Sequence, residues 1–317
     1  MNRGPFSNSA KAARDVIGRD GPWPTQLVPA ANGKPAVDVA DLVARALAVL
    51  DQHKVTQAPQ YREGKVPAVP LTRSASLEPT PDGRLTLQRR VLSDGAECSL
   101  PIRYFDAQYL VAAFLAAPDK ASELLAGTGL QPALQEDGRA IVDLYCIEYR
   151  KTDIGPYNEV GLTVRAKAPG DPIAASYVLH LPVTTAVANR AGREIWGYNK
   201  FVAGIDVKSE GRTFSTVLRD SGHEIISALE GRRGASVPMP ATDILTFSLD
   251  QGRLIKTVIK VLTPSFASGG DGLHFTVGPS SHPMASNLRK LALDGARPVM
   301  IHYTNGFEAL LFPGQAL

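Results

Sequence analysis

The sequence predicts an α+β protein that is mainly antiparallel β, with few helices and an N-terminal arm. Three observations favour this class. Beyond residue 100, most apolar segments are short, rich in β-branched residues and separated by turn residues. Only two segments have a clear helical pattern. The chain has 317 residues, of which 44% are hydrophobic and 21% are charged, and this is typical of a folded protein with about two domains.

The chain divides near residue 100 into an N-terminal extension, residues 1–100, and a β domain, residues 101–317. The first 37 residues are rich in glycine and proline, which predicts an irregular arm that depends on the rest of the protein for order. Residues 38–54 repeat large apolar side chains at spacings of three and four, and Asp38 is placed to cap a helix there. The extension is therefore expected to contain one amphipathic helix.

Proline dominates the end of the extension. Residues 55–81 contain five prolines, which remove backbone hydrogen-bond donors and predict a wrapping linker. Residues 84–92 alternate well enough to predict a strand, which we expect to join the sheet of the β domain. A second helix is predicted over residues 120–126, with Asp119 as its N-terminal cap and Gly127 at its C-terminal end.

Eight short segments of strand character follow, and turn sequences such as Asp220-Ser221-Gly222 separate them. These turns favour tight antiparallel connections over helical crossovers. So many strands with so few helices must close the sheet on itself or split it into two packed layers to protect its edges. The predicted strands span residues 142–149, 161–168, 175–183, 201–207, 213–218, 224–229, 244–249 and 254–261.

Charge and cysteine content exclude several classes of function. A net charge of +3 is too weak for the basic surface that binds nucleic acid. Cys98 and Cys146 form no CxxC motif and have no histidine at metal spacing, so neither a disulfide framework, a metal site nor a cofactor is expected. A reduced, cytoplasmic setting fits these two cysteines. We see no secretory signal and no apolar stretch long enough to span a membrane, so no membrane partner is expected.

Two segments contain a reactive residue type with apolar residues near it in the chain. Lys200 lies between Tyr198 and Phe201 in the chain. Desolvation there would lower the pKa of the lysine, and a neutral amine attacks a ketone to form an imine. Glu159 follows a Gly-Pro turn at the start of a strand, where it can serve as an acid–base group. From composition alone, Lys200 also fits a surface lysine and Glu159 also fits a solvated charge.

Two motifs occur in order within the β domain. Gly-Pro-Tyr-Asn-Glu-Val-Gly stands at residues 155–161, and Ala-Gly-Arg-Glu-Ile-Trp-Gly-Tyr-Asn-Lys stands at residues 191–200. Together they resemble the acetoacetate decarboxylase superfamily, and weaker similarity extends the resemblance over about residues 101–317. The resemblance implies a closed or cone-like β-barrel, a homo-oligomer, and a small-molecule keto acid or ketone as substrate.

The resemblance assigns roles residue by residue. Lys200 matches the lysine that forms the Schiff base, and Glu159 matches the pocket glutamate. Arg193 and Glu194 match a charged pair, which we expect to fix the turn before the lysine strand. The residues expected to bind the substrate are Tyr157, Trp196, Tyr198 and Arg103.

Several positions depart from the family pattern. Phe201 stands where the decarboxylases carry a second lysine, and Asn199 stands where they carry a proline. Ala107 takes the place of the arginine that holds the substrate carboxylate, although Arg103 lies close enough in the chain to supply it. Leu144 takes the place of an acidic residue, with Asp143 next to it. Apolar burial can activate Lys200 without the second lysine. The missing arginine would forfeit a charge-assisted hydrogen bond of about 1.5 to 3 kcal/mol, which weakens the case for a simple β-keto acid.

The leading hypothesis is a Schiff-base lyase that acts through Lys200, by decarboxylation or by aldol or dehydration chemistry, while Glu159 moves protons. The alternative is a non-catalytic β-barrel that binds a small ligand and has lost the reaction. A third possibility is that residues 1–100 bind a partner and the barrel is a scaffold. The six histidines show no metal-ligand spacing and are expected to be structural.

Overall fold

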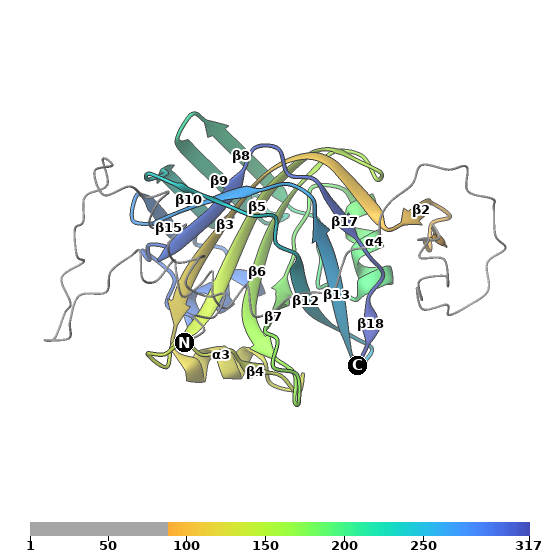
Figure 1. Cartoon of the computed structure of the whole chain (residues 1–317), viewed down its shortest axis with the longest axis horizontal. Helices are drawn as coiled ribbons and strands as arrows, with labels where there is room; N and C mark the ends of the chain where they lie inside the picture. The colour runs from red at the N-terminus through yellow and green to blue at the C-terminus, as the bar shows by residue number, and fades with distance from the viewer. Residues whose placement is uncertain (1–87) are drawn as a thin grey trace, which may run out of the picture. The chain divides into compact units, whose positions relative to one another are not determined.

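The computed structural model describes residues 88–317, which contain eighteen strands and three helices (Figure 1). The predicted arm, the helix over residues 38–54 and the proline-rich linker lie outside the described residues. The division near residue 100 stays a prediction.

Seven strands form a closed barrel. Each is hydrogen-bonded to the next in the order β3, β5, β6, β7, β12, β13 and β17, and β17 pairs with β3 to close the ring. All of these pairs are antiparallel except the parallel pair of β7 and β12. The predicted mainly antiparallel barrel is therefore confirmed. The strands are β3 (Ile102–Ala116), β5 (Ala140–Thr152), β6 (Tyr157–Lys167), β7 (Ala175–His180), β12 (Ile244–Asp250), β13 (Arg253–Val261) and β17 (Ala309–Leu311).

The central strands are apolar on both faces because both faces are covered. In β5, Tyr145 and Tyr149 face the barrel interior, whereas Leu144 and Cys146 face an outer layer. Figure 1 shows β3, β5 and β6 side by side through the middle of the domain. Strand alternation thus separates an interior set of side chains from an outer core.

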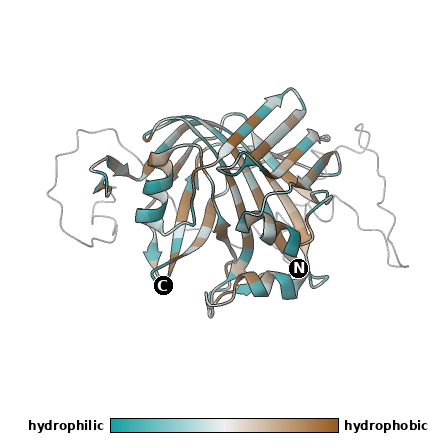
Figure 2. Cartoon of the chain, turned by 180° about the vertical axis from the view of Figure 1, so that it is seen from behind, coloured by the Kyte–Doolittle hydropathy of each residue, from teal (hydrophilic) through white to brown (hydrophobic). Residues whose placement is uncertain are grey.

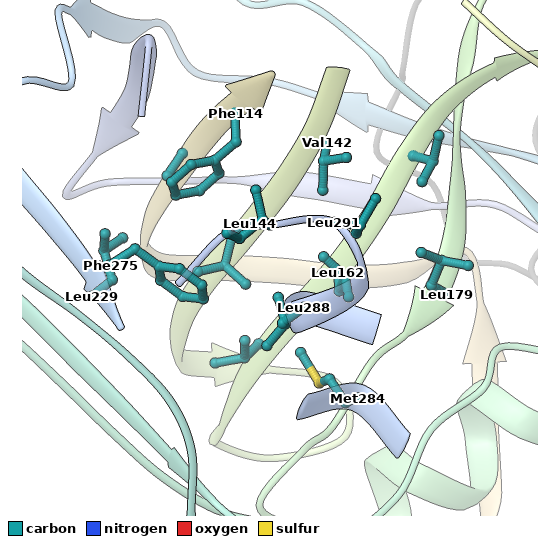
Figure 3. Packing of buried hydrophobic residues seen from close by; sticks show 14 of the residues in the cluster. Phe114, Val142, Leu144, Leu162, Leu179, Leu229, Phe275, Met284, Leu288 and Leu291 are labelled. Carbon is teal, nitrogen blue, oxygen red and sulfur yellow. The ribbon is translucent and has the colours of Figure 1, made fainter. Parts of the chain in front are cut away.

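A second antiparallel sheet and helix α5 (Pro283–Lys290) form that outer layer. The strands of this sheet follow the order β15, β10, β9, β8. Brown and teal residues alternate along its strands because one face is buried and the other is solvated (Figure 2). Figure 3 shows Phe275 of this sheet and Leu288 of α5 packed with Leu144 and Leu162 of the barrel. The strands are β8 (Gly204–Glu210), β9 (Thr213–Arg219), β10 (Ile225–Arg232) and β15 (Leu273–Val277).

The remaining elements lie outside the ring of seven strands. Their bounds are Gln88–Val91 (β1), Glu97–Leu100 (β2), Gln131–Pro132 (β4), Val237–Met239 (β11), Ser265–Ser268 (β14), Met300–Thr304 (β16), Gln315–Ala316 (β18), Pro118–Leu124 (α3) and Ala186–Trp196 (α4). None of the three helices in residues 88–317 has the length and apolar character needed to cross a membrane.

Three predictions about the elements are wrong. The strand expected over residues 84–92 does not join the barrel, because its described part, β1, pairs with β2 across a turn at Gly95. Asp119 does not cap α3; Ala117 precedes the helix, Pro118 begins it, and Asp119 lies in the first turn. The strand predicted from residue 201 begins at Gly204, so Lys200 lies in an extended segment before it. Helix α4 was not predicted.

Candidate active site

A cavity of about 70 Å³ lies inside the barrel and is lined mainly by aromatic and aliphatic side chains. Strands from several parts of the ring and helix α4 contribute to its wall. Its six tyrosines are Tyr104, Tyr109, Tyr145, Tyr149, Tyr157 and Tyr198. Lys200 and Glu159 both line it, so the structure brings the two residues that the sequence singled out into one site.

Lys200 reaches the cavity from the segment between α4 and β8, and the residue is only 5% exposed. Its Nζ donates a hydrogen bond to Oε2 of Glu159. The side chain lies directly across Gly192 of α4, where a Cβ atom would overlap Cε and Cδ of Lys200. The interpretation of Lys200 as a surface lysine is therefore wrong, and Gly192 is the residue that leaves room for its side chain.

The end of α4 fixes the lysine segment. Thr185 caps the start of the helix, and Gly197 ends it in the left-handed conformation with φ of 64°. The Tyr198 amide then donates to the Gly192 carbonyl at 3.1 Å. The Arg193 guanidinium donates through Nη1 to the Lys200 carbonyl oxygen at 3.0 Å. Helix and lysine segment are thus joined by both backbone and side-chain hydrogen bonds.

Arg193 and Glu194 do not act as the expected charged pair. Arg193 binds the Lys200 carbonyl, whereas the Glu194 carboxylate accepts from the Ser93 amide at 2.9 Å and from the Ser93 hydroxyl at 2.5 Å. Both residues lie inside α4. Adjacent residues of a helix point about 100° apart, so the two side chains reach different partners. Arg193 positions the lysine segment, and Glu194 holds the turn of the β1–β2 hairpin.

Glu159 lies on β6 and is 6% exposed. Besides the Lys200 ammonium, its carboxylate accepts a hydrogen bond from the Tyr149 hydroxyl at 3.4 Å. A buried charge is tolerated only when it is paired and hydrogen-bonded, and each member of this pair satisfies the other. The interpretation of Glu159 as a solvated charge is wrong for the same reason.

Three tyrosines stack beside the ion pair. The rings of Tyr104 and Tyr157 each lie 4.6 Å from the Tyr149 ring between their centroids. The Lys200 Nζ lies 5.8 Å from the centre of the Tyr157 ring, within the range of a cation–π contact. Burial raises the pKa of all three tyrosines. Their hydroxyls are therefore protonated donors at neutral pH.

Trp196 and Tyr198 line the cavity as well, and each has a fixed polar end. The Trp196 indole donates to the Phe312 carbonyl at 2.7 Å, and the Tyr198 hydroxyl lies 2.7 Å from Oγ1 of Thr246. Tyr157, Trp196 and Tyr198 thus line the same cavity as Lys200, and their role in substrate binding stays a prediction.

Arg103 does not line the cavity. Its side chain is 54% exposed, and its Nε lies 3.4 Å from Oδ2 of Asp153. The reason is strand alternation, since the neighbours Ile102 and Tyr104 are the residues of this stretch that face inward. The prediction that Arg103 binds substrate is therefore corrected.

The residues that depart from the family pattern lie in different parts of the domain. Ala107 is fully buried, and Leu144 belongs to the outer core and not to the cavity wall. The Phe201 ring packs 4.3 Å from the His282 ring. In residues 88–317 no group of three histidine, cysteine or acidic residues could hold a metal ion.

Sequence reasoning missed Tyr104, Tyr149 and Gly192. Tyr149 could have been found, because Tyr145, Ile147 and Tyr149 alternate along a predicted strand and so share one face. Nothing in the sequence marks Gly192 as the neighbour of Lys200.

The comparisons agree with this fold. The family model for acetoacetate decarboxylase (ADC) matches residues 92–256, which is more than half of the chain. No curated protein sequence matches the chain.

Solved structures share the fold at low sequence identity. Acetoacetate decarboxylase from Legionella pneumophila subsp. pneumophila str. Philadelphia 1 has a TM-score of 0.55 and 16% identity, over 78% of this chain and 98% of that one. The enduracididine biosynthesis enzyme MppR, complexed with pyruvate, has a TM-score of 0.53 and 15% identity, over 78% and 98%. An acetoacetate decarboxylase-like enzyme from Sphingomonas wittichii RW1 has a TM-score of 0.50 and 12% identity, over 68% and 92%. The barrel and the match over residues 92–256 together show that the chain belongs to the acetoacetate decarboxylase family.

Proposed function

We propose that this protein is a lyase that forms an imine between Lys200 and a small keto acid or ketone. The observation that carries the proposal is the Lys200–Glu159 pair, which is buried inside an apolar cavity of the barrel. Outside the two residues of the pair, the wall of this cavity is uncharged in the part of the chain that the structure describes.

The pair supplies the amine and the acid–base group that imine formation needs. Glu159 accepts a proton from the Lys200 ammonium, and the resulting amine attacks the carbonyl carbon of the substrate. The carbinolamine then loses its hydroxyl as water when Glu159 returns the proton. The product is a protonated imine whose positive charge faces the Glu159 carboxylate, so the site holds the same net charge before and after the step.

The imine acidifies the neighbouring carbon and accepts the electron pair of a bond broken there. Loss of carbon dioxide, loss of an aldehyde and loss of a proton all lead to the same enamine. Glu159 lies within reach of the reacting nitrogen, and Tyr149 donates to its carboxylate. We assign the proton transfers of these steps to Glu159, with Tyr149 as the residue that orients it.

Family relatives support this reaction class. One solved neighbour is an acetoacetate decarboxylase, and MppR is described with the condensation product of pyruvate and imidazole 4-carboxaldehyde. The first protein is named for the loss of carbon dioxide, and the second is described with a product of condensation between a keto acid and an aldehyde, which is the reverse of aldehyde loss. The homo-oligomeric state and the cytoplasmic location expected from the sequence stay predictions.

Borohydride trapping tests the proposal. Reduction in the presence of a ketone is expected to attach the substrate carbons to Lys200, as read by peptide mass spectrometry. Lys200→Ala should abolish the label, whereas Lys208→Ala, which changes an exposed lysine of β8, should leave it intact. Equal labelling of the Lys200→Ala variant, or no label with any carbonyl compound, would overturn the proposal and favour the binding-protein alternative.

A further inference from the structure

In residues 88–317, no free cation lines the cavity around Lys200. Among the described residues that line it, only Lys200 and Glu159 are charged at neutral pH, and they are paired with each other. Arginines near these elements have other partners. Arg193 donates to the Lys200 carbonyl, and Arg165 of β6 pairs with Asp143 at 2.8 Å between Nε and Oδ2.

A carboxylate would therefore enter this cavity at a penalty. It would lose its water without gaining a cation, and the Glu159 carboxylate would repel it. The tyrosine hydroxyls are neutral donors, because burial raises the pKa of Tyr145 and Tyr198 to about 12. Both of these hydroxyls already have partners, Ser176 for Tyr145 and Thr246 for Tyr198. The wall favours flat apolar groups over negative charge.

One polar atom of the wall points to an uncharged oxygen on the ligand. Thr163 lines the cavity and is 2% exposed, and its hydroxyl has no hydrogen-bond partner among the described residues. It lies four residues after Glu159 on β6, so about 13 Å of extended strand separates their Cα atoms. A neutral carbonyl or hydroxyl group would satisfy Thr163 without bringing a charge into the barrel.

We infer that the substrate is a small neutral ketone that carries a second uncharged oxygen, and that its reaction is aldol cleavage of a β-hydroxy ketone and not decarboxylation. The inference rests on the proposed imine chemistry of Lys200. A neutral ketone has no carboxylate to lose, and a cavity of about 70 Å³ limits it to a few carbon atoms.

The cleavage is balanced with 4-hydroxybutan-2-one as the probe. Lys200 forms the imine at the ketone carbon and releases water. Glu159 takes the proton of the hydroxyl group, the bond between the third and fourth carbons breaks, and formaldehyde leaves while the electron pair forms the enamine. Glu159 returns the proton to the third carbon, and water hydrolyses the imine to release acetone and the free amine. No oxidant or reductant is needed.

The test uses a matched pair of ligands on the full-length protein. Butan-2-one and 2-oxobutanoate differ only in a methyl group and a carboxylate beside the ketone. We expect the neutral ligand to bind about tenfold more tightly or better in calorimetry, and to be trapped on Lys200 by borohydride. Glu159→Gln leaves Lys200 as an unpaired cation, so this variant should bind the acid more tightly and reduce the difference in affinity between the two ligands.

The outcomes separate the two proposals. If the acid binds as tightly as the neutral ketone and is trapped as fast, the imine function stands and the inferred substrate class is overturned. If the neutral ketone binds preferentially but is never trapped, the imine function fails and the ligand class is supported. If neither binds, or if the probe releases no formaldehyde while acetoacetate releases carbon dioxide, the inference is overturned.

Discussion

Gly192 and Lys200 occupy one space, because the lysine side chain fills the volume in which any larger residue at position 192 would place its Cβ atom. Gly192 lies in the middle of α4, where glycine lowers helix stability by about 1 kcal/mol relative to alanine. Gly192 therefore lowers the stability of α4 and, in exchange, leaves space for the Lys200 side chain.

Gly192→Ala should displace Lys200 from Glu159. The added methyl group overlaps the lysine stem, so we expect the free energy of unfolding to fall by about 1 to 3 kcal/mol and borohydride trapping at Lys200 to be lost. Urea unfolding and peptide mass spectrometry measure these effects. Gly204→Ala is the control, because a Cβ atom there makes only an ordinary contact with Arg219 at 3.6 Å. Unchanged trapping in Gly192→Ala would contradict the prediction.

The Lys200–Glu159 pair should show strong energetic coupling. Lys200→Met leaves the Glu159 carboxylate buried without its partner, and Glu159→Gln leaves the ammonium in the same state. Each single variant should lose about 3 kcal/mol of unfolding free energy. The double variant carries no buried charge at these positions, so it should lose less than the sum of the two. Additive losses in a double-mutant cycle would show that the pair is not coupled.

Stability should fall in acid because of His180. Burial, followed by the neighbouring His282, lowers the pKa of His180 to about 4 in the folded protein, against about 6.5 in the unfolded chain. The folded protein favours the neutral imidazole of His180. Its contribution to the free energy of unfolding is therefore complete above about pH 6.5 and is lost as the pH falls from there through about 4. The shift is equivalent to about 3 kcal/mol.

Urea midpoints between pH 7 and pH 4 would measure this loss. His180→Gln should flatten the acid side of the profile, whereas His274→Gln, at an exposed position of β15, should leave it unchanged. If the urea midpoint falls equally with pH in wild type and in His180→Gln, the loss of stability is due to other groups. Since Nδ1 of His180 lies 3.3 Å from the Asn199 amide, beside Lys200, trapping should weaken over the same pH range.

Two threonines of the cavity wall should respond in opposite directions. Thr163→Val removes a buried hydroxyl that has no partner, so the free energy of unfolding should rise by about 1 kcal/mol. Thr246→Val removes a hydroxyl that lies 2.7 Å from the Tyr198 hydroxyl, so the free energy of unfolding should fall by about 1 kcal/mol. Thermal and urea unfolding would compare the two variants. A loss of stability in Thr163→Val would mean that its hydroxyl is hydrogen-bonded.

Strands with clear turn residues were predictable from the sequence. The segments at residues 244–249 and 254–261 pair as β12 and β13, and the turn between them uses Gln251 and Gly252 with positive φ values of 48° and 81°. Such turns are local, so the sequence carries their full signal. The order of strands around the ring depends on distant pairs such as β3 with β17. The strand pattern left open both closure and two packed layers, and the family resemblance favoured closure.

Helix α4 was not predicted although its sequence is amphipathic. Its buried face consists mostly of small residues, Ala188, Ala191 and Gly192, and a glycine near the centre lowers the helix propensity of the segment. The cap at Thr185 and the left-handed Gly197 were local signals of its ends. The two motifs predicted that Lys200 and Glu159 belong to one site, whereas the ion pair between them was not predicted.

The misplaced Arg103 follows from strand alternation alone, because it lies between Ile102 and Tyr104, which both line the cavity. Further along β3 the pairing with β5 is irregular between Tyr104 and Ala107, so a count of two does not hold across that stretch. Bulges depend on the partner strand, and a single sequence does not mark them.

The nucleophile and the acid are held by different elements of the fold. Lys200 is joined to α4 through Arg193 and the turn at Gly197, and its neighbours Asn199 and Phe201 accept hydrogen bonds from the amides of Leu181 and Val183, whereas Glu159 is built into β6 of the ring. The position of the amine therefore depends on how both α4 and the segment after β7 pack, while the position of the carboxylate is fixed by the sheet. Substitutions at these contacts would change the distance between amine and base without altering the ring of strands.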